Sequence, residues 1–548
     1  MKKIYLLIIS LLFLPSFAYA VNVNNELLLK AYLSTGADIV LTNDVMVTSN
    51  LPVNASSSID LNGHTIDMGT NTLVTYEPLI VKDESDSGIG KITGTGTFVI
   101  QVGSSSSPGT FILDSGTIDC RGSYCINNIG NMTINGGSIL GSTYVIITRK
   151  SLVMNGGHVY SNDDIAIGMT NGGTFVFNDG LISTDGDEFA VYVSANGGTF
   201  TMNGGSIEAL YEDVDDYKTG GVGLFVGSNT NSIINGGTIT AEAFAIAGNG
   251  SNNNSNITIN GGDITSIHGL GIYFPPVNSK LKITGGEISG LTGVEIRAGS
   301  LEVTGGTINA TSSTYSIGRN DSGSTSLGVG VAVTQHNTKS DIDVHICNGT
   351  INGLVPFAQA NTQQNSIDNL SKINILIDNS CGKPIFNSSN RETTVYSQNF
   401  DGFIQGGEFT TDVGKYIAPK YGEVLENGMQ VVYLYNNITV DDDDIEVVES
   451  ELRNNVVTVI TPDKPGYVVD KIIVTDENGN VIPVRNNKFI MPASDVHIKV
   501  LYIPEGEVKG DDIINPVTRD LIRCYIHILF TAIIGISLVV INKKLLID

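Results

Sequence analysis

A short phrase of alternating apolar and polar residues recurs along the chain. It reads apolar, any residue, apolar, then Asn or Thr, two glycines, any residue and Ile. Apolar side chains two apart share one face of a strand, and Asn-Gly-Gly favours a sharp turn because these residues enter left-handed backbone conformations easily. The phrase therefore predicts a short strand, a corner and a second short strand. Its copies are MTINGGSI (132–139), LVMNGGHV (152–159), FTMNGGSI (200–207), IINGGTI (233–239), ITINGGDI (257–264), LKITGGEI (281–288) and LEVTGGTI (301–308), with weaker ones at 111–118, 175–182, 345–351 and 403–409.

The spacing of the phrase indicates a solenoid. Its second glycine recurs mostly every 20–25 residues, and no helical period interrupts the pattern. A second apolar run follows each corner, as in DIAIG (164–168) and EFAVY (188–192). Two or three short strands per repeat predict a β-helix coil, with like positions stacked about 4.8 Å apart. We expect isoleucine and asparagine ladders to build a continuous core.

The first coils carry a family resemblance. Residues 21–36 are expected to cap the solenoid, with a short amphipathic helix over 24–35. The phrase IDLNGHTI at 59–66 resembles the first coils of the pectate-lyase-like right-handed parallel β-helix superfamily. The resemblance covers roughly 37–435 and implies that architecture. It does not by itself imply an activity, because one fold hosts many functions.

The composition changes after the solenoid. Residues 436–455 are predicted to be an acidic linker, whose four successive aspartates repel one another. Residues 456–503 alternate apolar and polar residues between turns, which predicts a small β module. The segments GY (466–467), NGN (478–480) and FIMPASDV (489–496) resemble the β modules of internalin-type bacterial surface repeats. That resemblance implies a stalk between a functional head and the envelope.

The first twenty residues predict a secretory signal. Lys2 and Lys3 precede an apolar run, and small residues flank Tyr19. This pattern predicts that residues 1–20 are a signal peptide, which is cleaved after Ala20. The alternative is a buried N-terminal helix. Secretion would place the chain in an oxidising compartment.

A second apolar run predicts a membrane anchor near the C-terminus. Cys524 to Ile541 is a run of 18 residues without formal charge, and two lysines follow it. Residues 521–542 are therefore predicted to form a transmembrane helix, with 543–548 as a cytoplasmic tail. The alternative is an amphipathic or buried helix. The fold class predicted for the whole chain is all-β: a right-handed parallel β-helix solenoid, a small β domain and a C-terminal transmembrane helix.

The linker at 504–520 ends in NPVTRD (515–520), which resembles the cell-wall sorting signal of bacterial surface proteins. In that family the motif is Leu-Pro-x-Thr-Gly or Asn-Pro-x-Thr-Gly, and a sortase cuts after Thr. Here Arg519 replaces the glycine. A sortase acting after Thr518 is therefore one expected partner, and attachment by the membrane helix alone is the alternative.

Composition excludes several classes of protein. The formal net charge of −26 repels phosphate backbones, so we expect no nucleic-acid partner. A hydrophobic content of 41% excludes a disordered chain, and the 63 glycines lack the three-residue period of collagen. Cys120 and Cys125 flank a short loop and are expected as a local disulfide or as free thiols. Cys347 and Cys381 are a further candidate pair.

The best candidate site is acidic. Carboxylates precede the second apolar run of two successive repeats, and the next repeat carries an acidic insertion. In register they line one corner of three stacked coils, where a hard cation such as Ca²⁺ could bind through six to eight oxygens. The alternatives are a cationic or sugar ligand, or solvated turns without a ligand. The predicted metal-binding residues are Asp163, Asp164, Asp185, Asp187, Glu188, Glu212, Asp213, Asp215 and Asp216.

Function remains open between three classes. We expect a surface-displayed bacterial adhesin or structural protein that binds glycans, or envelope or host polymers, along its long face. The first alternative is a calcium-dependent polysaccharide lyase or glycoside hydrolase, which needs paired carboxylates or a basic proton acceptor. Of the basic residues in the regular coils, only Lys218 falls at the acidic corner, so no catalytic residue or other cofactor is assigned. The second alternative is a mechanical spacer without a ligand.

Overall fold

The chain forms two compact units, which divide between Val432 and Tyr433. Residues 1–19 of the predicted signal peptide, the sorting-like motif at 515–520 and the predicted membrane anchor lie outside the described residues. Within the described part, none of the helices has the length and apolarity needed to cross a bilayer. The structure, a computed structural model, describes residues 20–507 except 121, 123, 195, 212–219 and 320–322.

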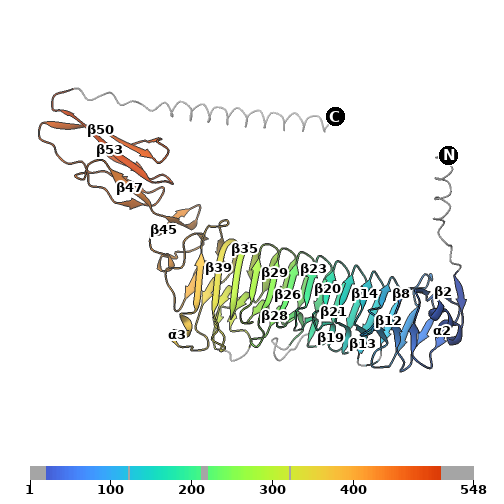
Figure 1. The fold of residues 1–548 in the computed structure, drawn as a ribbon. Helices are drawn as coiled ribbons and strands as arrows, with labels where there is room; N and C mark the ends of the chain where they lie inside the picture. The colour runs from blue at the N-terminus through green and yellow to red at the C-terminus, as the bar shows by residue number, and fades with distance from the viewer. Residues whose placement is uncertain are drawn as a thin grey trace, which may run out of the picture. The chain divides into compact units, whose positions relative to one another are not determined.

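The first unit is a stack of short parallel strands, which confirms the predicted all-β solenoid of parallel β-helix-like coils (Figure 1). A 30-stranded first sheet holds two strands of each coil, and a 14-stranded second sheet holds the third. The leading strands of the coils are β8 (Pro78–Lys82), β11 (Thr110–Leu113), β14 (Asn131–Ile134), β17 (Ser151–Met154), β20 (Thr174–Phe177), β23 (Thr199–Met202), β26 (Thr230–Ile234), β29 (Ser255–Ile259), β32 (Lys280–Ile283), β35 (Gly299–Ala310), β39 (Ile342–Gly353) and β41 (Ile373–Ile377).

Each leading strand turns at the glycine corner into a second strand, and the chain then crosses to the second sheet. The strands after the corner are β9 (Lys91–Gly94), β12 (Thr117–Cys120), β15 (Ser138–Gly141), β18 (His158–Ser161), β21 (Leu181–Thr184), β24 (Ser206–Ala209), β27 (Thr238–Ala241), β30 (Asp263–Ser266), β33 (Glu287–Gly290) and β42 (Ile385–Ser388). The second sheet contains β4 (Leu51–Val53), β7 (Leu73–Thr75), β10 (Ile100–Val102), β13 (Tyr124–Asn128), β16 (Tyr144–Thr148), β19 (Ile165–Met169), β22 (Phe189–Val193), β25 (Val222–Val226), β28 (Phe244–Gly248), β31 (Leu270–Phe274), β34 (Thr292–Ile296), β38 (Val329–Val333), β40 (Val355–Gln359) and β43 (Val395–Ser397).

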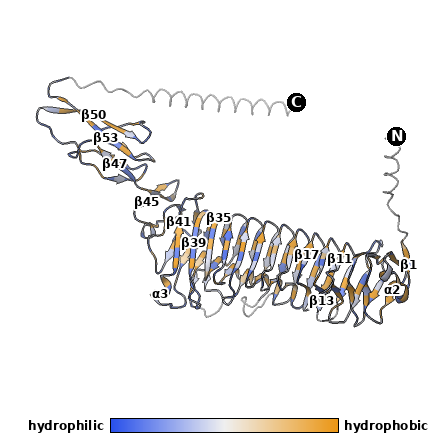
Figure 2. Ribbon diagram, viewed as in Figure 1, coloured by the Kyte–Doolittle hydropathy of each residue, from blue (hydrophilic) through white to orange (hydrophobic). Residues whose placement is uncertain are grey.

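The core is a set of apolar columns that run along the solenoid. Buried apolar residues alternate with more exposed ones along strands of the first sheet such as β17, β20 and β23, and apolar and polar stretches recur from coil to coil (Figure 2). Burial of these columns supplies the main driving force for folding, because each coil covers its neighbour. The column after the corner is fully or almost fully buried at Ile139, Val159, Ile182, Ile207, Ile239, Ile264, Ile288, Ile308 and Ile351.

The asparagine ladder forms, but outside the core. Asn203 donates from Nδ2 to Asn178 Oδ1 at 2.8 Å, and Asn235 donates to Asn203 in the same way at 2.8 Å. These side chains are exposed at the glycine corner, which corrects the prediction that they help to build the core. The reason is the position of each residue: the asparagines lie at the corner after the leading strand and face water, whereas Ile239 and its equivalents lie on the next strand and point into the core. The ladder therefore fixes the register from outside.

A helix covers the first coil, as predicted for residues 24–35. Helix α2 (Glu26–Thr35) begins at Asn25, whose side chain accepts a hydrogen bond from the Leu28 amide. Leu29 and Leu33 are fully buried against the core. The helix thus covers apolar surface that the first coil would otherwise expose.

The second unit is a small β domain, which the alternating pattern at 456–503 predicts. Its five-stranded sheet contains β48 (Ser450–Glu451), β47 (Asn436–Val440), β53 (Val496–Pro504), β50 (Tyr467–Asp476) and β51 (Val481–Ile482), in that order. A two-stranded sheet pairs β49 (Val456–Thr458) with β52 (Lys488–Ile490).

The acidic segment at 436–455 differs from the predicted linker because it supplies two strands of this sheet. β47 lies beside β53 in parallel register. The repulsion between its aspartates is offset by lysines of the module: Asp442 lies 2.7 Å from Lys464 Nζ, and Asp441 lies 3.5 Å from Lys499 Nζ. These contacts hold the segment inside the unit.

Candidate functional site

The outer surface of the second sheet carries a row of aromatic side chains. In β16, Ile146 belongs to the core, and Tyr144 and Ile147 are half-buried. In β22, Val191 belongs to the core, and Phe189 and Tyr192 are half-buried. The pairing of β13 with β16, and of β22 with β25, brings equivalent residues side by side. We call this row the aromatic face, and it consists of Phe98, Tyr124, Tyr144, Phe189, Tyr192 and Phe225.

The aromatic face has two clusters of rings. Phe189, Tyr192 and Phe225 form one cluster, with ring centroids 4.5 Å apart for Phe189 and Phe225 and 5.5 Å apart for Tyr192 and Phe225. Tyr124 and Tyr144 belong to the other, with ring centroids 5.9 Å apart. Such rings place flat apolar surface beside water. This is typical of a binding surface, whereas a surface without a ligand is usually covered by polar side chains.

Between the clusters lies β19, where Ile165 pairs with Tyr144 in place of a ring and Gly168 leaves room for the Tyr144 ring. A Cβ added at Gly168 would lie 3.0 Å from the Tyr144 ring. Beyond the second cluster, Phe244 and Tyr273 continue the apolar surface but are each only 7% exposed. The accessible part of the row therefore runs from β10 to β25.

Two of the predicted metal ligands border the aromatic face. Asp164 and Glu188 come directly before β19 and β22. Burial first, and then neighbouring carboxylates, raise the pKa of both groups. Burial and the charges of Asp164 and Glu188 also raise the pKa of the Tyr144 phenol. The acidic corner and the aromatic face are thus one continuous surface around Tyr144.

The structure brings the other described carboxylates of the corner into the same two coils. Asp163 and Asp187 are exposed. Asp185 is also exposed, and it accepts a hydrogen bond from the Tyr160 hydroxyl at 2.6 Å. The remaining four predicted ligands, Glu212, Asp213, Asp215 and Asp216, lie outside the described residues.

The described part of the corner does not form a ready cation site. Among the described residues, no three of its carboxylates bring ligand atoms within 4.8 Å of one another, a criterion that His345, Cys347 and Asp378 meet elsewhere. Asp164 Oδ1 is buried without a hydrogen-bond partner. The Ca²⁺ site stays a prediction, since four of its nine residues are not described.

We expect Asp164→Asn to stabilise the first unit at neutral pH by about 0.5 kcal/mol. The raised pKa of Asp164 means that the folded protein holds this proton more tightly than the unfolded chain does. Stability is therefore lost as the pH rises through the folded pKa, and the amide removes that loss. Thermal unfolding at neutral pH should show a higher midpoint, with no gain at a pH below the usual aspartate range. Asp86→Asn, in an exposed loop, is the control, and an equal gain from both variants would contradict the account.

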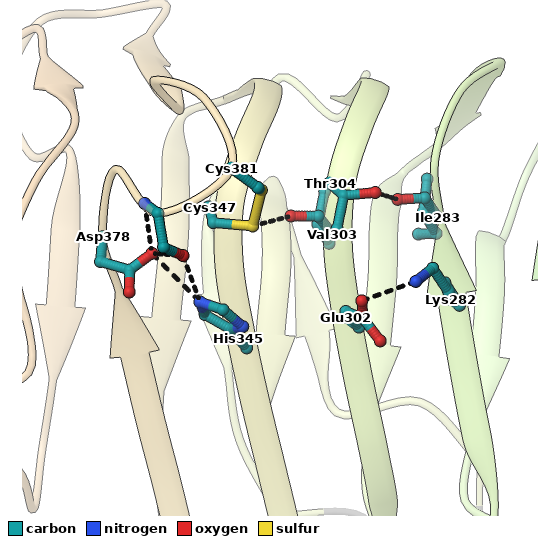
Figure 3. Close-up of a disulfide and its surroundings, with 10 residues drawn as sticks. Lys282, Ile283, Glu302, Val303, Thr304, His345, Cys347, Asp378 and Cys381 are labelled. Atoms are coloured by element: carbon teal, nitrogen blue, oxygen red, sulfur yellow. Dashed lines mark hydrogen bonds and ion pairs between the residues drawn. A yellow bond between two sulfur atoms is a disulfide. The ribbon is translucent and has the colours of Figure 1, made fainter.

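The first sheet carries a separate groove of about 500 Å³ on its outer surface, lined by Lys280, Glu302, Asp343 and His345 among others. Glu302 lies 2.5 Å from Lys280 Nζ and accepts a hydrogen bond from Lys282 at 2.7 Å (Figure 3). These hydrogen bonds hold the pKa of Glu302 below its usual range. Both lysines are therefore ion-pair partners of Glu302.

Arg297, another basic residue of the regular coils, is fully buried against the second sheet. Its Nη1 donates to Gly323 O at 2.6 Å, and its Nε donates to Thr334 O at 3.1 Å. Glu295 is equally buried and lies 3.8 Å from Arg297 Nε. This pair attaches the segment around Thr325 to the sheet and is closed to substrate.

Sequence reasoning missed the aromatic face and the groove. From the sequence, the runs DIAIG and EFAVY predict only the second apolar strand of their coils. A signal was present, because apolar residues occupy all positions of these strands instead of alternating, as they do where both faces of a sheet are covered or bind something. The structure also forms two disulfides, Cys120–Cys125 and Cys347–Cys381.

The aromatic face and its carboxylate border are the features of the described residues that bear on function. Comparisons with family models, with curated proteins and with solved structures found no match to the chain.

Proposed function

We propose that this chain is a secreted, surface-displayed protein whose right-handed parallel β-helix binds a glycan polymer along the aromatic face. One observation carries the proposal: half-buried rings follow one another across neighbouring coils, with carboxylates beside them. Ring faces pack against the apolar C–H faces of sugars, and carboxylates accept hydrogen bonds from sugar hydroxyls.

A polymer fits this surface better than a small molecule. The strands β10 to β25 are six neighbours in the sheet, so the row spans about 24 Å at 4.8 Å per strand. The rings are half-buried in two clusters along neighbouring strands, whereas small ligands are usually enclosed in a concave pocket. The acidic border disfavours nucleic acids and polyanionic sugars, and favours neutral or amino sugars.

Display outside the cell is supported by the two disulfides, because such bonds persist in oxidising compartments and are rare in the cytosol. The sequence adds three parts to this proposal: a signal peptide for secretion, a membrane helix for anchoring, and a sortase as a partner. The second unit then serves as the stalk between the β-helix and the envelope.

A calcium-dependent lyase or a glycoside hydrolase is the second candidate. Asp164 and Glu188 favour it, because carboxyls with a raised pKa in neighbouring coils are groups from which acid catalysis is built. Release of new reducing ends or of unsaturated sugars from a bound glycan, in the presence of Ca²⁺, would establish this candidate over an adhesin. A mechanical spacer predicts that no glycan binds.

We expect Tyr192→Ala to weaken glycan binding about tenfold, or about 1.4 kcal/mol. Tyr192 contacts both other rings of its cluster, with Phe189 at 5.4 Å and Phe225 at 5.5 Å between centroids. A glycan array with the full chain identifies the ligand, and titration of the best hit then measures the affinity. Tyr467→Ala, in the second unit and 52% exposed, is the matched control. Equal affinities for both variants, or an array without hits, would contradict the proposal.

A further inference from the structure

Two successive coils bring four metal-ligating side chains together at the glycine corner of the first sheet. His345 and Cys347 are two residues apart on β39, whose register against β35 is irregular at Cys347, and both side chains meet the segment that follows β41 (Figure 3). Asp378 and Cys381 come from the segment that follows β41 in the next coil. Figure 3 shows all four around the Cys347–Cys381 disulfide.

The four side chains are already close. His345 Nε2 lies 3.1 Å from Asp378 Oδ1, and one ligand atom of each of His345, Cys347 and Asp378 lies within 4.8 Å of the other two. Cys347 and Cys381 are joined, with their Cα atoms 5.3 Å apart. Ser380 Oγ donates to Asp378 Oδ1 at 2.7 Å and lies 3.4 Å from His345 Nε2. The hydroxyl thus contacts both groups that would meet a cation.

Thiolate sulfur, imidazole nitrogen and carboxylate oxygen are the ligands that zinc takes in tetrahedral sites. In such a site a nitrogen and an oxygen ligand are about 3.3 Å apart, close to the spacing that His345 and Asp378 already have. Two thiolates on the same ion are about 3.8 Å apart, so the two sulfurs must separate. While the disulfide is intact, neither sulfur is a thiolate and the set is incomplete.

We propose that reduction of the Cys347–Cys381 disulfide creates a zinc site formed by His345, Cys347, Asp378 and Cys381. A small dithiol supplies two electrons and two protons, the S–S bond breaks, and the dithiol becomes a disulfide itself. Zinc then binds as the two thiols release their protons to solvent. Nothing in this inference depends on the glycan-binding proposal.

The burial of the cluster fits an exchange between the two states. Cys347 is 1% exposed, whereas Cys381 and Ser380 are exposed on the segment that covers it. Reductant and metal therefore reach the cluster from the side of this segment. A shift of its backbone separates the two sulfurs to the distance that zinc requires. Either the disulfide or the metal links the same two coils, so the end of the solenoid stays fastened in both redox states.

The test uses Co²⁺ as a spectroscopic probe of tetrahedral thiolate ligation in the full chain, reduced under argon and freed of reductant. The background carries Cys120→Ala, Cys125→Ala and Cys524→Ala, so that Cys347 and Cys381 are the remaining cysteines. We expect one Co²⁺ per reduced chain, with thiolate-to-cobalt charge-transfer and visible d–d bands that zinc abolishes. The oxidised chain should show no such bands.

His345→Ala is the decisive variant, because its ring lies on the outer face and its loss leaves both thiols in place. We expect at least about tenfold weaker Co²⁺ binding, and a similar loss for Asp378→Asn. Far-ultraviolet circular dichroism checks that each variant keeps its β structure. The proposal is overturned if the reduced chain binds no Co²⁺, or if both variants bind it as tightly as the parent.

Discussion

Replacing Glu295 with Gln should lower the free energy of unfolding of the first unit by about 3–5 kcal/mol. Glu295 is fully buried and accepts hydrogen bonds from Thr325 Oγ1 at 2.6 Å, Ser326 Oγ at 2.9 Å and Thr334 Oγ1 at 2.7 Å. The neutral amide keeps the shape but leaves Arg297 as a buried charge without its counter-ion. Urea unfolding followed by circular dichroism measures the loss.

Glu302→Gln is the matched control for this prediction, since it removes a carboxylate paired with cations at the partly exposed surface of the first sheet. Such a pair contributes less than about 1 kcal/mol. Limited proteolysis near Thr325 should also become faster in Glu295→Gln, because that segment is attached through the buried carboxylate. Equal losses from the two glutamates would show that the buried pair does not hold the segment.

Gly237→Ala should cost about 3 kcal/mol, the second large effect. Gly237 has a φ of +88°, and an added Cβ would lie 2.6 Å from Gly205 O in the preceding coil. Since that oxygen belongs to the backbone of a stacked corner, neither coil can move without losing ladder hydrogen bonds. Hydrogen exchange around the corner and urea unfolding both report the loss.

Gly197→Ala separates the two causes of this cost. Gly197 has the same φ of +88°, but a Cβ there would meet nothing within 4 Å. It should therefore show only the cost of the backbone conformation, about 1 kcal/mol. If Gly237→Ala were no worse than Gly197→Ala, close stacking of the corners would be refuted.

The sequence predicts the solenoid well because its determinants are local and repeated. In each coil, a glycine allows the sharp corner and an Ile at the place of Ile239 points into the core. Because these requirements are the same in every coil, the structure of one repeat predicts that of the others. The ladder of Asn203 and Asn235 was expected in the core, and lies at the exposed corner instead. Periodicity indicates that like residues stack, but it does not decide whether the stack faces the core or water.

The candidate sites were harder to predict because their partners come from different coils. Glu295 meets Thr325 and Thr334 across insertions of irregular length, and His345 meets Asp378 from the next coil. Neither pair has a spacing that a motif would reveal. The aromatic face was missed for another reason: apolar residues on both faces of a strand resemble core residues in the sequence, although the rings on the outer face are only half-buried.

The central claim is that the repeats are coils stacked one per strand spacing, and paired spin labels measure this directly. Asn131 and Asn256 are equivalent positions five coils apart, and Asn131 and Ser300 are seven coils apart. Double electron–electron resonance should give backbone separations of about 24 Å and about 34 Å, a rise of about 4.8 Å per coil. Distances that are alike for the two pairs, or that do not grow with the number of coils, would contradict the stacked solenoid.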